Sequence, residues 1–71
     1  MDNTLNSKYT QKELEIINLI ALGLTNKEIA RELYISISTV KTHLENIFYK
    51  AGVSNRVQLA IFALKNGLLN G

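Results

Sequence analysis

Hydroxyl and basic side chains cluster between residues 36 and 46 in a pattern that suits contact with an extended polyanion. Ser38, Thr39 and Thr42 carry hydroxyls on short side chains, and Lys41 adds a positive charge among them. Short polar groups let the backbone approach its ligand closely, and they can exchange hydrogen bonds with the edges of nucleic-acid bases. A bulky apolar surface at this place would instead indicate a protein partner. The segment is therefore a candidate nucleic-acid contact.

These polar groups lie on one side of a helix that the spacing predicts from its N-cap, Ser36, to about Lys50. Apolar residues recur every three or four positions, which places them together on the other side. The apolar positions are Val40, Leu44, Ile47, Phe48 and Ala51. The polar side consists of Ser38, Thr42, Glu45 and Tyr49, flanked by Lys41 and Asn46. Gly52 ends the predicted helix.

Two earlier helices are predicted by capping boxes, in which a Thr hydroxyl and a Glu three residues later satisfy free backbone groups. The first box, residues 10–13, opens a helix that runs to about Leu22, and Gly23 supplies the left-handed residue that stops it. The second box, residues 25–28, opens a short helix to about Leu33. The inward positions are expected to be Leu14, Ile17, Ile20 and Ala21 in one helix and Ile29, Ala30 and Leu33 in the other.

A fourth helix is predicted from about Asn55 to Asn66, with Ser54 as its cap and Gly67 as its stop. It carries two apolar stripes that point in different directions, whereas a helix with one buried face needs only one such stripe. The stripes are Leu59 with Ala63, and Val57 with Ile61 and Leu64. The second stripe is expected to form an isologous contact in a homodimer, the alternative being that a small bundle buries both stripes.

The second and third predicted helices have the spacing of a helix-turn-helix unit, joined at Tyr34 and Ile35. Ala30 supplies the small residue where the two helices cross, and Val40, ten positions later, packs back onto the first of them. In such a unit the second helix enters the major groove of DNA, and its N-terminal residues reach base edges. The N-termini of both helices offer N–H groups to phosphates, with Lys27 as a further phosphate candidate.

Length and composition allow one small domain. The chain has 71 residues, of which 46% are apolar, so a packed core is expected. It has no Cys, which excludes disulfides and thiolate metal sites. Residues 10–32 carry three basic and four acidic side chains, whereas residues 33–71 carry four basic and one acidic. The basic part of the chain is the part that holds the candidate contact.

Other classes of protein find little support in the sequence. The longest apolar run, residues 59–64, is far shorter than the roughly 20 residues that a bilayer span needs. No secretory leader is visible, so a cytoplasmic setting is expected. No nucleophile–base pair, Gly-rich phosphate loop or carboxylate pair indicates an enzyme. Residues 1–9 are polar and aperiodic and are predicted to be a flexible arm or linker remnant, and residues 10–71 to form the domain.

At fixed spacings, the chain closely resembles the LuxR-type, or GerE-like, DNA-binding domain. The matching residues are Thr25-Asn26-Lys27-Glu28-Ile29-Ala30, Ile35-Ser36, Thr39-Val40-Lys41-Thr42-His43-Leu44, Asn46-Ile47, Lys50, Val53 and Asn55-Arg56. The opening at residues 9–13 and the ending at Gly67-Leu68 are also similar. Two positions depart from the family pattern: Tyr9 replaces the usual Leu, and Glu45 stands where members often carry a polar or basic residue.

This resemblance implies an all-α, four-helix (tetrahelical) helix-turn-helix domain of a bacterial transcription regulator. Its third helix, residues 37–50, would lie in the major groove of double-stranded DNA. Its fourth helix would form a homodimer on a pseudo-palindromic site. The domain would be a stand-alone regulator or the C-terminal part of a larger one, with RNA polymerase as a candidate partner and without a cofactor, metal, small-molecule ligand or membrane. The expected DNA-binding residues are Asn26, Lys27, Ser36, Ser38, Thr39, Lys41, Thr42, His43, Glu45 and Asn46, and the expected dimer residues are Val57, Ile61 and Leu64.

Some residues keep a second interpretation. Lys41 could pair with Glu45 one helical turn away instead of contacting DNA. His43 suits a phosphate contact and a partly buried hydrogen bond equally, and Arg56 either braces the bundle or touches DNA. For the chain as a whole, the alternative is a helical protein–protein interaction module on the same scaffold.

Overall fold

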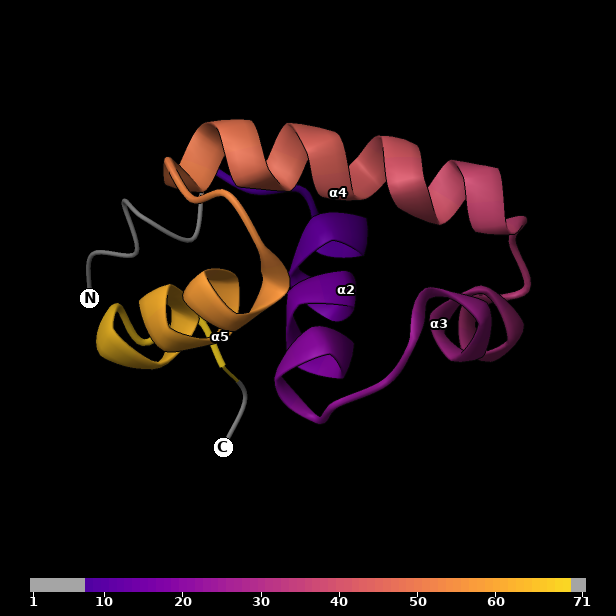
Figure 1. Ribbon diagram of the computed structural model, residues 1–71, viewed down its shortest axis with the longest axis horizontal. Helices are drawn as coiled ribbons and strands as arrows, with labels where there is room; N and C mark the ends of the chain where they lie inside the picture. The colour runs from indigo at the N-terminus through magenta and orange to yellow at the C-terminus, as the bar shows by residue number, and fades with distance from the viewer. Residues whose placement is uncertain (1–7, 70–71) are drawn as a thin grey trace.

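The computed structural model describes residues 8–69, and this part of the chain is all-helical, as predicted. It contains α2 (Gln11–Ala21), α3 (Asn26–Leu33), α4 (Ile37–Ala51) and α5 (Arg56–Lys65). The longest helix, α4, runs across one side of the molecule, with α3 beneath its N-terminal end, α2 beneath its middle and α5 towards its C-terminal end (Figure 1). None of these four helices combines the length and the apolar character needed to cross a membrane.

The first two of these helices begin at the predicted capping boxes. Thr10 Oγ1 accepts the backbone N–H of Glu13 at 3.1 Å, and Glu13 Oε1 accepts the N–H of Thr10 at 2.9 Å. The same reciprocal pair joins Thr25 and Glu28, at 3.1 and 2.8 Å. Each box satisfies two backbone donors that the first turn of a helix leaves free, which fixes where α2 and α3 start.

The start of α5 differs from the prediction by one residue. Asn55, not Ser54, is the N-cap, and its Oδ1 accepts the N–H of Gln58 at 2.9 Å. Gln58 Oε1 in turn accepts the N–H of Ser54 at 2.8 Å. Asn and Ser are equally good caps, and here Asn55 caps the helix while Gln58 bonds back to the residue before it.

The turn between α3 and α4 is made by a residue in an unusual backbone conformation. Tyr34 has a φ of 58°, in the left-handed region. This conformation costs residues other than glycine roughly 1–2 kcal/mol. The turn closes with the N–H of Ile35 donating to the carbonyl of Ala30 at 3.0 Å. This 6→1 bond satisfies a terminal carbonyl of α3 and sends the chain directly into α4.

The core lies where α2 meets α4 and α5, and residues from every helix reach it. Its buried members are Tyr9, Ile16, Ile17, Ile20, Ile29, Ala30, Val40, Leu44, Ile47, Leu59, Ala63 and Leu68. The predicted stripe on α2 is wrong in part, because Ala21 is exposed and Leu14 only half-buried, while Ile16 is fully buried. The buried face of α2 is wider than one stripe because α4 and α5 cover it from two sides.

Tyr9 requires a correction of the predicted arm. Its side chain is 5% exposed and belongs to the core, so the ordered domain begins before residue 10. Lys8 is exposed, and residues 1–7 of the predicted arm lie outside the described residues.

Candidate nucleic-acid interface

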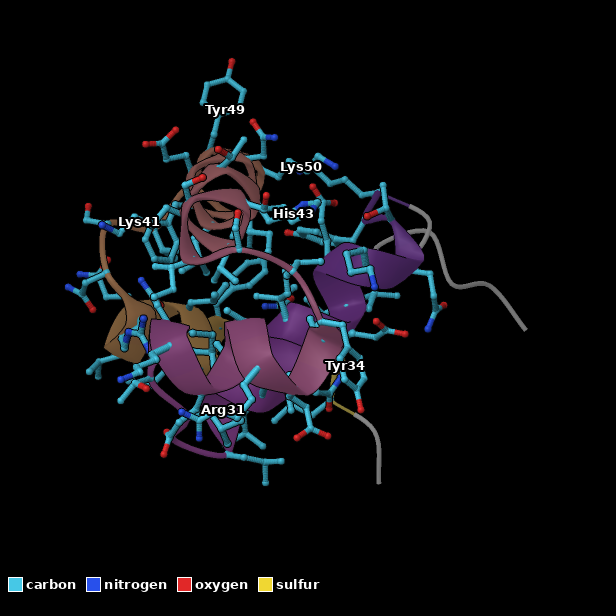
Figure 2. All side chains as sticks on the ribbon, turned by 90° about the vertical axis from the view of Figure 1, so that its right-hand side faces the viewer. Arg31, Tyr34, Lys41, His43, Tyr49 and Lys50 are labelled. Atoms are coloured by element: carbon cyan, nitrogen blue, oxygen red, sulfur yellow. The ribbon has the colours of Figure 1, made fainter. Side chains whose placement is uncertain are left out.

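The surface of α4 is divided as its sequence predicts. Val40 and Ile47 are fully buried against the rest of the domain. On the other side Ser38, Thr42 and Glu45 are exposed. Figure 2 looks along α4 and shows Tyr49 pointing away from the molecule, Lys41 on one flank, and His43 and Lys50 on the other. The polar face of α4 therefore forms the outer surface of the domain on this side.

The hydroxyls at the start of α4 are organised by the helix cap. Ser36 Oγ accepts the N–H of Thr39 at 3.0 Å and lies 2.8 Å from Thr39 Oγ1 and 3.3 Å from Ser38 Oγ. Thr42 Oγ1 donates to the carbonyl of Ser38 at 3.1 Å, which leaves its oxygen free to accept. Thr39 is half-buried, whereas Ser36, Ser38 and Thr42 are exposed. The cap and the Thr42 bond to Ser38 thus hold three exposed hydroxyls, of Ser36, Ser38 and Thr42, within one short stretch.

Charged and amide groups continue this surface along α4. Lys41, Glu45 and Asn46 are all exposed, and His43 is half-buried on the flank. Within residues 8–69 no ion pair joins Lys41 to Glu45; the two pairs found there are Lys50 with Glu13 and Lys12 with Glu15. The alternative partner for Lys41 is therefore not seen, and its ammonium group faces solvent.

The start of α3 lies beside the α4 surface and is held in place by a residue of α5. Lys27 is exposed in the first turn of α3, whereas Asn26 is half-buried. Arg56 Nη1 donates to the carbonyl of Leu24 at 2.8 Å, and its Nη2 donates to Asn26 Oδ1. Arg56 thus braces the bundle, which is one of the two roles that its sequence position allows. The groove at this place is lined by Asn26, Lys41, Leu44, Glu45, Phe48, Ser54, Asn55 and Arg56.

A buried ion pair joins α2 to the C-terminal end of α4. Glu13 is 4% exposed, and its Oε1 lies 2.6 Å from Lys50 Nζ. Burial raises the pKa of Glu13, but the Lys50 and Thr10 hydrogen bonds and the charges of Lys50 and His43 outweigh it, so the pKa is lowered overall. Lys50 Nζ also lies 5.8 Å from the centre of the Tyr9 ring. In the sequence Lys50 is the end of the predicted helix and one of the residues that match the family pattern, and no local pattern indicates a partner 37 residues away.

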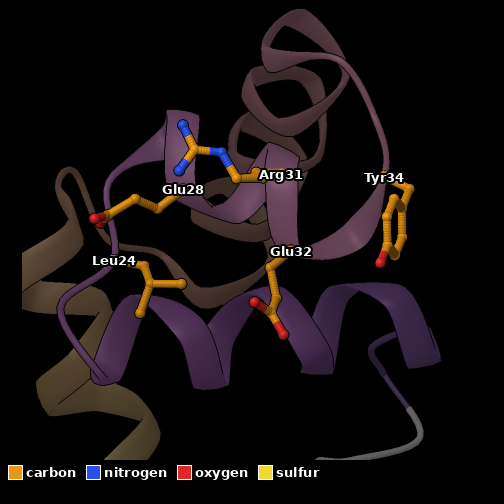
Figure 3. Close-up of a pocket in the computed structure, with 5 residues that line it drawn as sticks. All are labelled: Leu24, Glu28, Arg31, Glu32 and Tyr34. Atoms are coloured by element: carbon orange, nitrogen blue, oxygen red, sulfur yellow. The ribbon is translucent and has the colours of Figure 1, made fainter.

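A second hollow lies on the side of α3 that faces away from α4. It is lined by Leu24, Glu28, Arg31, Glu32 and Tyr34. Figure 3 shows the Glu32 carboxylate directed towards α2 and Tyr34 at the opposite end of the hollow from Leu24. Figure 2 places Arg31 across the molecule from Tyr49. Two carboxylates against one guanidinium make this hollow a poor place for a polyanion, which leaves the α4 side as the candidate interface.

A helix-turn-helix unit with an exposed polar second helix, set on two further helices, defines a class of DNA-binding domains found in transcription regulators. The model of the family described as bacterial regulatory proteins, luxR family (GerE), matches residues 7–63. The chain belongs to this family.

Several known proteins are similar to the chain. The transcriptional regulatory protein LiaR of Bacillus subtilis is 57% identical over 61 residues, which cover 86% of this chain and 29% of LiaR. The CsgBAC operon transcriptional regulatory protein of Escherichia coli is 46% identical over 65 residues, covering 92% of this chain and 30% of that protein. The solved structure of the transcription factor GerE superposes with a TM-score of 0.81 at 36% identity, covering 89% of this chain and 94% of that one. The chain spans less than a third of the length of these two regulatory proteins.

Proposed function

We propose that the domain binds double-stranded DNA sequence-specifically to regulate bacterial transcription, with α4 in the major groove. The observation that carries this proposal is the exposed polar face of α4, which presents Ser38, Thr42 and Lys41 on the side opposite the core. No chemical step is required, since the output of such a domain is occupancy of a promoter. As part of a regulator the domain would act in the cytoplasm, with RNA polymerase as a further candidate partner and no cofactor or small-molecule ligand.

The residues divide into two kinds of contact. Phosphate contacts position the protein on the duplex, and base contacts select the sequence. The first turns of α3 and α4 direct free N–H groups and the positive ends of their dipoles outward, and Lys27 adds charge beside one of them. Further along α4, the ammonium of Lys41 suits guanine, and the carboxylate of Glu45 suits the amino group of cytosine. The full proposed set is Asn26, Lys27, Ser36, Ser38, Thr39, Lys41, Thr42, His43, Glu45 and Asn46.

The decisive experiment is selection of bound duplexes from a random pool, followed by a salt titration of the recovered site. Counterion release makes the affinity of a DNA-binding protein fall steeply with salt. The second candidate function, a protein–protein interaction module, rests on the apolar stripe of α5 and would show little salt dependence. Absence of any enriched sequence, together with salt-independent binding of the chain to other proteins, would overturn the proposal.

The dimer is proposed to form through α5. Val57, Ile61 and Leu64 are 65%, 50% and 70% exposed, so the bundle leaves this second stripe uncovered. A self-complementary apolar patch is the usual basis of a two-fold dimer. Two domains joined in this way would place their α4 helices in successive major grooves, with half-site centres about 10 bp apart.

The Ile61→Asp variant should weaken cooperative binding to a two-half-site duplex, because a charge is placed in the proposed apolar contact. Binding to a single half-site and the helical CD spectrum should change little, since half of the Ile61 side chain is already exposed. Sedimentation and half-site titrations measure both effects. Lys65→Gln, which changes the net charge by the same amount on the same helix, serves as the control. Unchanged cooperativity and association would contradict the proposed dimer surface.

The Glu45→Ala variant should bind duplexes of mixed sequence more tightly, by about two- to fivefold at low salt, because a negative charge near the phosphates is removed. Fluorescence anisotropy with a labelled mixed-sequence duplex measures the change. Glu32→Ala is the matched control, since it removes the same charge from the hollow on the other side of α3. Equal effects of the two variants, or weaker binding by Glu45→Ala to every sequence, would argue against this placement of Glu45.

A further inference from the structure

Arg56 connects the first turn of α5 to the start of α3 through two hydrogen bonds. Its Nη1 donates to the carbonyl of Leu24 at 2.8 Å, and its Nη2 donates to the side-chain oxygen of Asn26. The guanidinium therefore contacts the residue at the beginning of α3 whose side chain lines the groove next to Lys41. This arrangement does more than hold two helices together, because it also determines which end of the Asn26 amide faces outward.

The orientation of the amide follows from its chemistry. A guanidinium group carries only donors, so the Asn26 oxygen must face Arg56 and the NH2 group must point away from it. No residue among 8–69 accepts a hydrogen bond from this NH2 group. Tyr9 is the only residue in this range with a buried side-chain polar atom that has no partner, so the NH2 group of the half-buried Asn26 is not fully enclosed. Two unused donors thus belong to a residue that lines the groove together with Lys41.

We propose that Arg56 is a positioning residue that directs the NH2 group of Asn26 towards a phosphate of the DNA backbone. This inference rests on the proposed DNA-binding function and specifies how one of its residues acts. A phosphate offers only acceptors, which match the two Asn26 donors. The carboxylate of Glu45, on the α4 side of the groove, would repel an anion, so the phosphate is placed on the α3 side. Arg56 itself makes no contact with DNA in this arrangement.

The Asn26→Asp variant separates the two roles of the side chain. A carboxylate still accepts from Arg56, now as a charge-assisted pair, and a negative charge suits the first turn of α3. The thermal midpoint should therefore stay the same or rise. Affinity for a duplex recovered by selection should fall at least about tenfold, since the donors are lost and a charge is turned towards the phosphate. Fluorescence anisotropy and thermal unfolding of the full 71-residue chain measure the two quantities, with Lys65→Gln as the control for net charge.

A double-mutant cycle tests whether Arg56 acts through Asn26. Arg56→Ala should weaken DNA binding several-fold in the wild-type background and have little further effect in the Asn26→Ala background. An Arg56 that contacted DNA directly, or that merely stabilised the fold, would weaken both backgrounds equally. That result, or wild-type affinity in Asn26→Asp, would overturn the inference while leaving DNA binding intact. Absence of DNA binding by the wild-type chain would instead remove the proposed function and the inference together.

Discussion

Replacing Ile47 with Ala is expected to lower the free energy of unfolding by about 2–5 kcal/mol, which is the cost of a cavity where a large buried side chain stood. Ile47 is fully buried on the inner side of α4. A domain of this size has a total stability of only about 4–10 kcal/mol, so a large part of the population should unfold under mild denaturant. Urea denaturation followed by far-UV CD measures the change.

The control for this prediction is a second isoleucine, Ile37, at the N-terminal end of the same helix. Ile37→Ala removes the same atoms from a side chain that is 42% exposed, and it should cost less than about 1 kcal/mol of the free energy of unfolding.

Adding a tightly bound duplex should raise the urea midpoint of the Ile47→Ala variant, because a ligand that binds only the folded state stabilises it. Equal destabilisation by the two variants would mean that the inner face of α4 does not support the core.

Replacing Lys50 with Met should destabilise the domain by about 3 kcal/mol at neutral pH, because a buried carboxylate then loses its partner. In the wild-type domain the pKa of Glu13 is lowered from its ordinary value of 4.5. Glu13 therefore adds stability above that value, and this stability is lost as the pH falls through the lowered pKa. Without Lys50, two of the causes that lower the pKa of Glu13 are lost while its burial remains, so the pKa should rise relative to the wild type and protonation should cost the folded variant less.

The difference in the free energy of unfolding between the wild type and Lys50→Met should accordingly be largest near neutral pH and should become smaller on acidification. Chemical denaturation at a series of pH values from about 7 to about 3 measures it. Lys12→Met is a matched control, because Lys12 pairs with Glu15 at 3.4 Å with both side chains more than 40% exposed. That exposed pair should contribute less than about 1 kcal/mol. A difference for Lys50→Met that stays constant with pH would mean that packing of the Lys50 alkyl chain, and not its charge, stabilises the domain.

The sequence alone predicts those structural features that depend on residues close to one another in the chain. The capping boxes at Thr10 and Thr25 are local, with both partners within three positions, and both are confirmed. The two-sided character of α4 is confirmed for the same reason, since the apolar period is visible along the helix itself. At Ser54 and Asn55 two good caps stand side by side, and the missed local sign is Gln58, which stands three residues after Asn55 and donates its N–H to the Asn55 side chain.

Contacts between distant segments could not be predicted in this way. The Glu13–Lys50 pair and the Arg56 contact with Asn26 join residues 37 and 30 positions apart. Each depends on the angle at which one helix crosses another, which no periodicity encodes. The same limit explains Tyr9, whose polar, aperiodic surroundings suggested an arm although its ring packs into the core below Lys50.

The inner face of α4 packs on the domain along its length, with Val40, Leu44 and Ile47 all buried, and different helices support its two ends. Near its N-terminus α4 rests on α3, and near its C-terminus Lys50 ties it to α2. A substitution in α2 or α3 that moves one of these supports would change the inclination of α4 and so the direction of its exposed side chains. If α4 binds DNA as proposed, two relatives with the same exposed residues on α4 would differ in sequence preference through substitutions in these supporting helices.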